Sequence, residues 1–449
     1  MLSYLFLLLA IIVIMLLAYR LLDGEVLSPT LVACAAYLVS TILAMIGLLS
    51  WNDQEYLYAS TMAICILGIV SFFIGELISR IIFKCDNKKD NSRKNHTIHI
   101  RAIVYILITI FIIAATIILI VEIKRVCLSF GFKGDSLPEA LAFYRSKTSL
   151  FSNELNSTGI DIGFIPKQMK KVVDCLFVIF AFIATNNFLS NKKNKNSYIY
   201  PLVICMMCVP SSFLGNGGRA MLMHMIISFA MIVAILFQVL YKKTKTPVVN
   251  KKKLIIAICC AALLSGLIFY STTPIVGRNN NDSNIVEYMS FYLGTPIASM
   301  NKKITEGGIE HDKIGEKTFY GVYSTLDRYG IIKYDKPNSN DWVTHNGYHS
   351  NVYTSFWSEY CDFGILGVII LQAIFGFCSG LMYVMVTKKD NIYLLLVYAF
   401  YAYVLIDQIR DNHFYSLLSS TTIVYLVIIY CLYFLLIKKD YKWIKLNKK

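Results

Sequence analysis

The side chains best suited to chemistry are concentrated between His345 and Gly364. This stretch reads His-Asn-Gly-Tyr-His-Ser-Asn-Val-Tyr-Thr-Ser-Phe-Trp-Ser-Glu-Tyr-Cys-Asp-Phe-Gly and combines two histidines, two carboxylates and several aromatic rings. An unperturbed histidine titrates near neutral pH, so His349 is suited to acid–base chemistry. Asp362 and Glu359 are alternative bases, or carboxylates that orient the histidine. The residue types leave the choice among the three open.

The same stretch lacks a metal-binding pattern. His345 and His349 are four residues apart, but Gly347 lies between them and no glutamate occupies the position that a zinc motif requires. The twelve cysteines lie mostly in apolar segments, where cysteine behaves as a small hydrophobic residue. We therefore expect neither a metal ion nor an organic cofactor.

Three arginines elsewhere in the chain are candidates for binding phosphate. Arg219 follows Gly217 and Gly218 in a turn that leads into an apolar segment, Arg278 follows a second turn, and Arg410 lies in the stretch Asp-Gln-Ile-Arg-Asp-Asn-His. Glycines let backbone N–H groups approach a ligand, a helix N-terminus favours anions, and the guanidinium is a planar, always-charged fork. For Arg219 the competing interpretation is a tight hairpin with an arginine at the membrane interface, and the stretch around Arg410 is a mixed cluster of basic and acidic residues.

The elements that must position these residues are membrane helices. The chain has 449 residues, is 56% hydrophobic and only 16% charged, and has a mean hydropathy of +0.57. A membrane helix needs roughly 20 apolar residues, and about eleven runs (10–12) approach that length. We expect an all-α, polytopic integral membrane bundle that forms a single domain over residues 1–449. The expected spans are 2–19, 27–49, 58–82, 100–121, 172–189, 198–214, 220–241, 254–270, 365–386, 392–406 and 415–437.

Positive charge sets the predicted orientation. More than half of the 43 lysines and arginines lie in short segments on one side of the expected bundle, and cytoplasmic loops are enriched in these residues. The two long loops, 122–171 and 271–364, therefore face outward, and the second carries the His345–Gly364 stretch. The net charge of +15 follows from this asymmetry, and no nucleic-acid recognition motif accompanies it, so we expect no nucleic-acid partner.

Both outer loops contain helix signals. In the first, Ser136 or Asp135 followed by Pro138 and Glu139 predicts the start of a short helix. In the second, Asn284 precedes an apolar stripe at helical spacing, which predicts an interfacial helix that breaks near Pro296. Within the spans, Glu76 is the main buried carboxylate expected, and bonding to neighbouring helices is favoured over an ion path.

The late motif resembles that of a known enzyme family. The stretch Asn-Val-Tyr-Thr-Ser-Phe-Trp-Ser-Glu-Tyr-Cys-Asp-Phe-Gly, which begins at Asn351, lies between a long outer loop and a span, as in bacterial oligosaccharide repeat-unit polymerases of the Wzy type. The Gly-Gly-Arg turn that ends at Arg219 is similar to a second feature of this group. The likeness extends to the layout of most of the chain, but an Arg-x10-Gly repeat described for some members has no clear copy.

The resemblance implies a glycosyltransferase of the bacterial inner (cytoplasmic) membrane. Such an enzyme joins undecaprenyl-diphosphate-linked oligosaccharide units into O-antigen or capsular polysaccharide on the outer face, and works beside a flippase and a chain-length regulator. The arginines would hold the leaving diphosphate, while His345, Asn351, Tyr353 and Trp357 would shape the sugar site. An O-antigen ligase, which uses a lipopolysaccharide core as acceptor, and a lipid-linked glycan flippase are the alternatives.

Overall fold

The chain is an all-α polytopic membrane protein. The computed structural model describes residues 1–83, 97–147, 161–190, 193–214, 219–244, 264–274, 284–307, 314–334, 342–388 and 391–438. Within these ranges nine helices are long and apolar enough to cross a membrane. The described chain forms two compact units.

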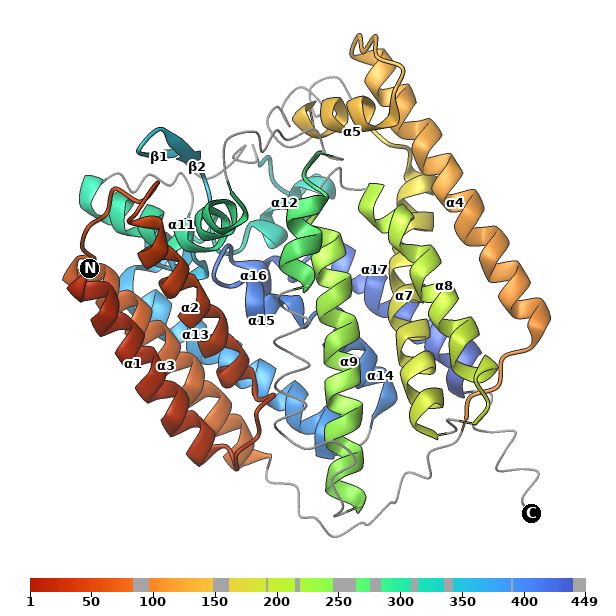
Figure 1. Ribbon diagram of the computed structural model, residues 1–449, viewed down its shortest axis with the longest axis horizontal. Helices are drawn as coiled ribbons and strands as arrows, with labels where there is room; N and C mark the ends of the chain where they lie inside the picture. Colours follow the sequence, from red (N-terminus) through yellow and green to blue (C-terminus); the bar gives the residue numbers. More distant parts are fainter. Residues whose placement is uncertain are drawn as a thin grey trace. The chain divides into compact units, whose positions relative to one another are not determined.

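Unit 1 comprises Met1–Asp86, Asn280–Lys389 and Val404–Thr422, and contains every described residue of the late motif. Its first three helices lie side by side with the long helix α13 (Figure 1). Its elements are α1 (Leu2–Leu21), α2 (Pro29–Gly47), α3 (Ala59–Ile82), α11 (Ile285–Glu306), α12 (Tyr320–Arg328), β1 (Val343–His345), β2 (Tyr348–Ser350), α13 (Ser355–Lys388), most of α15 (Tyr403–Asp407), α16 (His413–Ser416) and the first residues of α17 (Ser420–Tyr433).

Unit 2 comprises Asn87–Asn279, Asp390–Tyr403 and Ile423–Lys449. Helix α7 is buried along most of its length and packs against α4, α8 and α9. The unit contains α4 (Ala102–Ser129), α5 (Leu137–Arg145), α7 (Phe164–Ser190), α8 (Asn196–Leu214), α9 (Ala220–Thr244), α14 (Ile392–Phe400), the rest of α17 and the π-helical turn η3 (Phe434–Lys438).

Nine of the expected spans correspond to the nine long apolar helices. The last of these runs from α17 into η3, over Ser420–Lys438. The expected span 392–406 is instead two short helices, α14 and α15, separated by a turn at residues 401 and 402. Most of the expected span 254–270 lies outside the described residues, so the total of about eleven stays a prediction.

Helices α3 and α13 pack more closely than ordinary side chains allow. A Cβ atom on Gly376 would overlap the carbonyl oxygen of Phe72, and one on Gly75 would overlap that of Ala373. Small residues at such contacts let membrane helices approach through dispersion and weak polar contacts, because apolar burial alone does not favour helix association in lipid. This interface fixes α13 against the core of unit 1.

The helix-start signals at Ser136 and Asn284 are confirmed. The side chain of Ser136 accepts a hydrogen bond from the backbone N–H of Glu139 at the start of α5. Asn284 accepts one from the N–H of Glu287 at 2.8 Å and caps α11. The predicted break in that helix is wrong, because α11 continues through Pro296. The packing of α11 on α2, where Gly294 meets the backbone of Ala44, supports the helix across the proline.

The end of unit 1 that the charge pattern places in the cytoplasm holds a buried ion-pair cluster. Arg80 bonds Glu76 at 2.6 Å and Glu25 at 2.9 Å. The second oxygen of Glu76 accepts the backbone N–H and the hydroxyl of Thr30 at 2.7 and 2.6 Å. Glu76 is therefore bonded to neighbouring groups, as the sequence led us to expect.

Candidate functional site

A two-stranded hairpin separates the two histidines of the late motif. Strands β1 and β2 are joined by Asn346 and Gly347, which both have positive φ (44° and 85°), as a two-residue hairpin turn requires. Cross-strand partners share a face of the hairpin. His349 pairs with Thr344 on the exposed face, and its Nδ1 lies 2.9 Å from the Thr344 hydroxyl. His345 faces inward and is fully buried.

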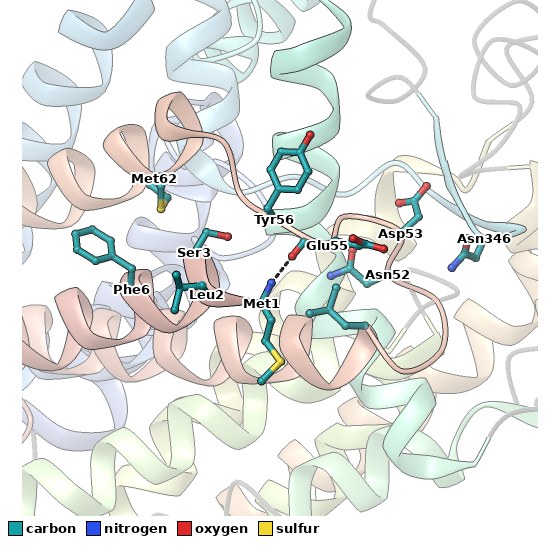
Figure 2. Close-up of a pocket in the computed structure, with 11 residues that line it drawn as sticks. Met1, Leu2, Ser3, Phe6, Asn52, Asp53, Glu55, Tyr56, Met62 and Asn346 are labelled. Atoms are coloured by element: carbon teal, nitrogen blue, oxygen red, sulfur yellow. Dashed lines mark hydrogen bonds between the residues drawn. The ribbon is translucent and has the colours of Figure 1, made fainter.

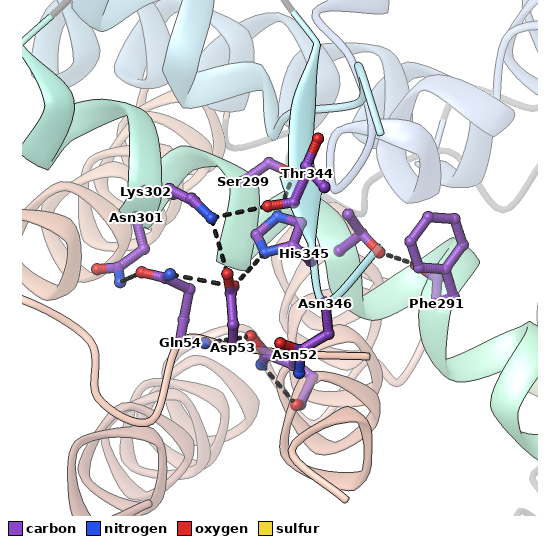
Figure 3. Close-up of polar contacts among 12 residues, drawn as sticks. Asn52, Asp53, Gln54, Phe291, Ser299, Asn301, Lys302, Thr344, His345 and Asn346 are labelled. Carbon is purple, nitrogen blue, oxygen red and sulfur yellow. Dashed lines mark hydrogen bonds and ion pairs between the residues drawn. The ribbon is translucent and has the colours of Figure 1, made fainter. Parts of the chain in front are cut away.

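His345 lies at the centre of a polar network that joins the hairpin, α11 and the connection between α2 and α3 (Figure 3). Its Nδ1 is 2.7 Å from Asp53 Oδ1, and its Nε2 is 3.2 Å from the hydroxyl of Ser299 on α11. Lys302 bonds the other oxygen of Asp53 at 2.7 Å. Burial lowers the pKa of His345 more than the nearby carboxylate raises it. Because an ionised carboxylate only accepts hydrogen bonds, Nδ1–H donates to Asp53, and Nε2 faces the hydroxyl of Ser299.

The order Asp53–His345–Ser299 is the order of groups in a serine nucleophile relay. The hydroxyl of Ser299 has no contact with solvent, because both Ser299 and His345 have 0% exposure. No substrate carbonyl can approach it in this arrangement. The network instead ties the hairpin and α11 to the loop between α2 and α3.

A cavity of about 1020 Å³ opens beside the network (Figure 2). Asp53 belongs to both, and Asn346, the residue after His345, also lines the cavity. Apolar and polar groups share the lining, which suits an amphipathic ligand with hydroxyl groups. The lining residues are Met1, Leu2, Ser3, Phe6, Leu48, Asn52, Asp53, Glu55, Tyr56, Met62 and Asn346.

The second half of the motif forms the first part of α13 and folds back against the rest of that helix. Gly364 interrupts α13 with φ 63° and ψ −162°, so the segment before it is a separate helical arm. Gln372 Nε2 lies 2.8 Å from Glu359 Oε1 and 3.4 Å from the hydroxyl of Ser355. A straight helix rises ~1.5 Å per residue, and would hold Ser355 and Gln372 far apart. The arm therefore packs against the span that follows it.

The arm is buried in the core of unit 1. Tyr353 and Trp357 stack at 5.3 Å between ring centroids and are 1% and 3% exposed. Asn351 is half-buried. Asp362 Oδ2 accepts the backbone N–H of Thr318 at 2.6 Å, so this carboxylate holds the segment before α12.

The loop that contains Arg410 meets the start of this arm. The Ser355 N–H donates to the carbonyl oxygen of Gln408 at 2.8 Å, and the Tyr37 hydroxyl donates to the same oxygen at 3.1 Å. Tyr37 lies midway along α2, so the loop lies at mid-height of the helices of unit 1. Non-helical backbone at this depth occurs where it is enclosed by protein or lines a water-filled space. The structure thus brings Arg410 and the motif together.

The loop around Arg410 contains hydrogen-bond donors that no described residue accepts from. Its Nη1 is 3.7 Å from Asp407, and His413 Nε2 is 3.7 Å from the other oxygen of the same carboxylate. Arg410 Nε and Asn412 Nδ2 are buried and have no hydrogen-bond acceptor among the described residues. The 408–412 loop therefore contains two donors that the described residues leave without an acceptor.

Arg219 belongs to unit 2 and is already engaged. Its Nη1 donates to the carbonyl oxygen of Phe269 at 2.7 Å and to the hydroxyl of Thr273 at 2.6 Å, and the guanidinium lies over the Phe269 ring. The side chain is 5% exposed. Gly217, Gly218 and Arg278 lie outside the described residues, so their predicted phosphate contacts stay predictions.

Sequence reasoning did not find Asp53, Ser299 or Lys302. Asp53 is 292 residues from His345 and lies in a short polar connection without a motif. The sequence also did not predict that Glu359 is buried. Its burial depends on a single residue, Gly364, whose positive φ turns the chain.

Comparison of the chain with family models, with curated proteins and with solved structures found no match.

Proposed function

We propose that this protein joins undecaprenyl-diphosphate-linked oligosaccharide units into a polysaccharide on the outer face of the bacterial cytoplasmic membrane. The observation that carries the proposal is the pair of unmet donors in the 408–412 loop, Arg410 Nε and Asn412 Nδ2, held against the motif by the Ser355–Gln408 bond. The reaction transfers a sugar from a lipid diphosphate to a hydroxyl of a second lipid-linked unit.

The unmet donors fit the leaving group of that reaction. A buried donor without an acceptor costs ~1–3 kcal/mol, so each of these two donors is stabilised when an oxygen of a ligand or of water accepts from it. The guanidinium of Arg410 and the amide of Asn412 would bind oxygens of a diphosphate, on which negative charge develops as the sugar–oxygen bond breaks. No nucleotide is required, because the donor already carries its leaving group.

We propose that His349 is the general base that takes the proton from the acceptor hydroxyl. Its ring is exposed on the hairpin, and Nδ1 is engaged with Thr344, which leaves Nε2 for a hydroxyl of the acceptor sugar. Glu359 is fully buried and has no surface that an acceptor could touch. Asp362 accepts a hydrogen bond from the backbone N–H of Thr318, just before α12. Asp53, Asn52 and Asn346 in the cavity wall are placed to bind sugar hydroxyls.

Substitution of Arg410 by lysine tests the proposal. Lysine keeps the charge but not the Nε donor or the planar fork, so we expect a loss of ~10²–10³-fold in polymerisation, comparable to removal of one oxyanion donor. Cells would then carry single repeat units in place of long chains. The matched control is Arg328→Lys, because Arg328 is an exposed arginine of the same unit that bonds Ser420. Long chains from Arg410→Lys at normal abundance would overturn the proposal.

Transport of the lipid-linked unit is the second candidate, and one observation favours it. Charged side chains at mid-height of a bundle are costly and usually mark a path, and Asp407, with 7% exposure, lies beside the mid-height loop. A transporter would move the substrate without forming a glycosidic bond. Analysis of the products therefore separates the two functions.

A further inference from the structure

The hydrogen bonding around Glu359 and Gln372 is incomplete in a specific way. Both side chains have 0% exposure, and the amide nitrogen of Gln372 donates to Glu359 Oε1 at 2.8 Å. The remaining oxygens, Glu359 Oε2 and Gln372 Oε1, are buried and have no hydrogen-bond donor among the described residues. Two unmet acceptors therefore flank one hydrogen bond.

Within the part of the chain that the structure describes, no positive charge pairs with Glu359. Among the described ion pairs none includes this carboxylate. The titratable groups that interact with it are neutral hydroxyls, namely Tyr37 from α2 and Tyr415 from α16, and Cys65 of α3 lies near Tyr37. An isolated carboxylate in an apolar interior is neutralised instead of remaining charged and unpaired. By contrast, the buried Glu76 retains its arginine partner.

We propose that Glu359 is a proton-binding site, held as a neutral carboxylic acid that donates from Oε2 to Gln372 Oε1. With the existing bond from Gln372 Nε2 to Glu359 Oε1, this closes an acid–amide ring with two hydrogen bonds. One proton satisfies both unmet oxygens and removes the uncompensated charge. The proposal does not depend on the reaction that the protein catalyses.

The site is connected to the loop that contains Arg410. Gln372 Nε2 is 3.4 Å from the hydroxyl of Ser355, which is 3.4 Å from that of Tyr37. The Ser355 N–H and the Tyr37 hydroxyl both donate to the carbonyl oxygen of Gln408. Loss of the proton would place a bare charge at one end of this chain of bonds. The proton on Glu359 therefore holds the loop in position.

Infrared difference spectroscopy of the purified full chain tests the proton directly. A buried neutral carboxylic acid gives a C=O stretch well above that of a carboxylate, and we expect one such band at neutral pH. The band should be absent in Glu359→Gln and should shift in Gln372→Leu, which removes its partner. Glu139→Gln, at an exposed position of α5, should leave the band unchanged. A spectrum of Glu359→Gln identical to wild type would overturn the proposal.

Thermal stability against pH gives a second, independent test. An acid that stays protonated in the folded state but ionises in the unfolded state makes the free energy of unfolding fall as pH rises. The melting temperature of Glu359→Gln, whose amide can close the same ring, should exceed that of wild type by an increment that grows from about pH 5 to about pH 8. A difference in melting temperature that stays constant between these pH values would contradict a protonated Glu359 and overturn the proposal. Stabilisation of wild type but not of Glu359→Gln by Na⁺ over choline at equal ionic strength would assign the oxygens to a cation and overturn the proton site.

Discussion

Asp53 is the residue whose substitution should best reveal the polar network around His345 in unit 1. It accepts hydrogen bonds from Lys302 at 2.7 Å, His345 at 2.7 Å and Gln54 at 3.1 Å. Burial acts to raise the pKa of Asp53, but the bonds from Lys302, His345 and Gln54 together outweigh it and lower the pKa from 3.8 to about 2. Asp53→Asn keeps the shape and removes the charge.

The pKa gives the size of the effect. Each unit of pKa difference corresponds to ~1.36 kcal/mol, so the shift from 3.8 to about 2 means that the charged form of Asp53 stabilises the folded state by at most ~2.4 kcal/mol. Salt and the 26% exposure of the side chain reduce this value. Because the folded-state pKa is depressed, the stabilisation is complete above the unfolded-state value of ~3.9 and is lost as the pH falls towards 2.

The assay is thermal or denaturant unfolding of purified protein in detergent at several pH values. We expect Asp53→Asn to lower the free energy of unfolding by ~1–2 kcal/mol at pH 7, and the two proteins to converge as the pH falls towards the folded-state pKa. Asp135→Asn, at an exposed carboxylate before α5, is the matched control and should change little. A loss that is the same at pH 7 and at the acid end would refute the electrostatic account, because the amide would then be acting through its shape alone.

Two further predictions concern packing and capping. Gly376→Leu should force α13 away from Phe72 and lower the free energy of unfolding by at least ~1–3 kcal/mol, as overpacking does. The yield of folded protein measures this effect. The control Ile370→Leu, on the exposed face of the same helix, should fold normally. Asn284→Ala should lower stability by ~0.5–2 kcal/mol through loss of the α11 cap, while Asn284→Ser, which keeps a capping oxygen, should restore most of it; equal melting temperatures for all three proteins would contradict the role of the cap.

The membrane helices were predictable because their signals are local. Long apolar runs have no alternative to helix in lipid, so nine expected spans correspond to observed helices, although α4, α7 and α13 each extend eight to ten residues beyond the expected span at one end. The caps at Ser136 and Asn284 were equally local, since each depends on residues one turn apart. The break predicted at Pro296 is not observed, because the packing of α11 on α2 outweighs the local free-energy cost of a proline in a helix.

The site was harder to predict because it depends on contacts between distant segments. Burial of His345 follows from the hairpin register and from Asp53, which lies near the other end of the sequence. The arm before Gly364 was expected at the membrane lip, but one glycine in a left-handed conformation lets it fold back into the core. Arg410 was a candidate from its residue type alone, and its unmet donors could be seen only in the folded loop.

The most direct measurement of the proposed function uses purified protein in proteoliposomes with a polyprenyl-diphosphate-linked oligosaccharide and no nucleotide. The proposal predicts a ladder of longer lipid-linked glycans with release of one polyprenyl diphosphate for each bond formed. Arg410→Lys should abolish the ladder, and Arg328→Lys should retain it. Movement of the substrate across the bilayer without a new glycosidic bond, or no conversion by folded wild-type protein, would contradict the proposal.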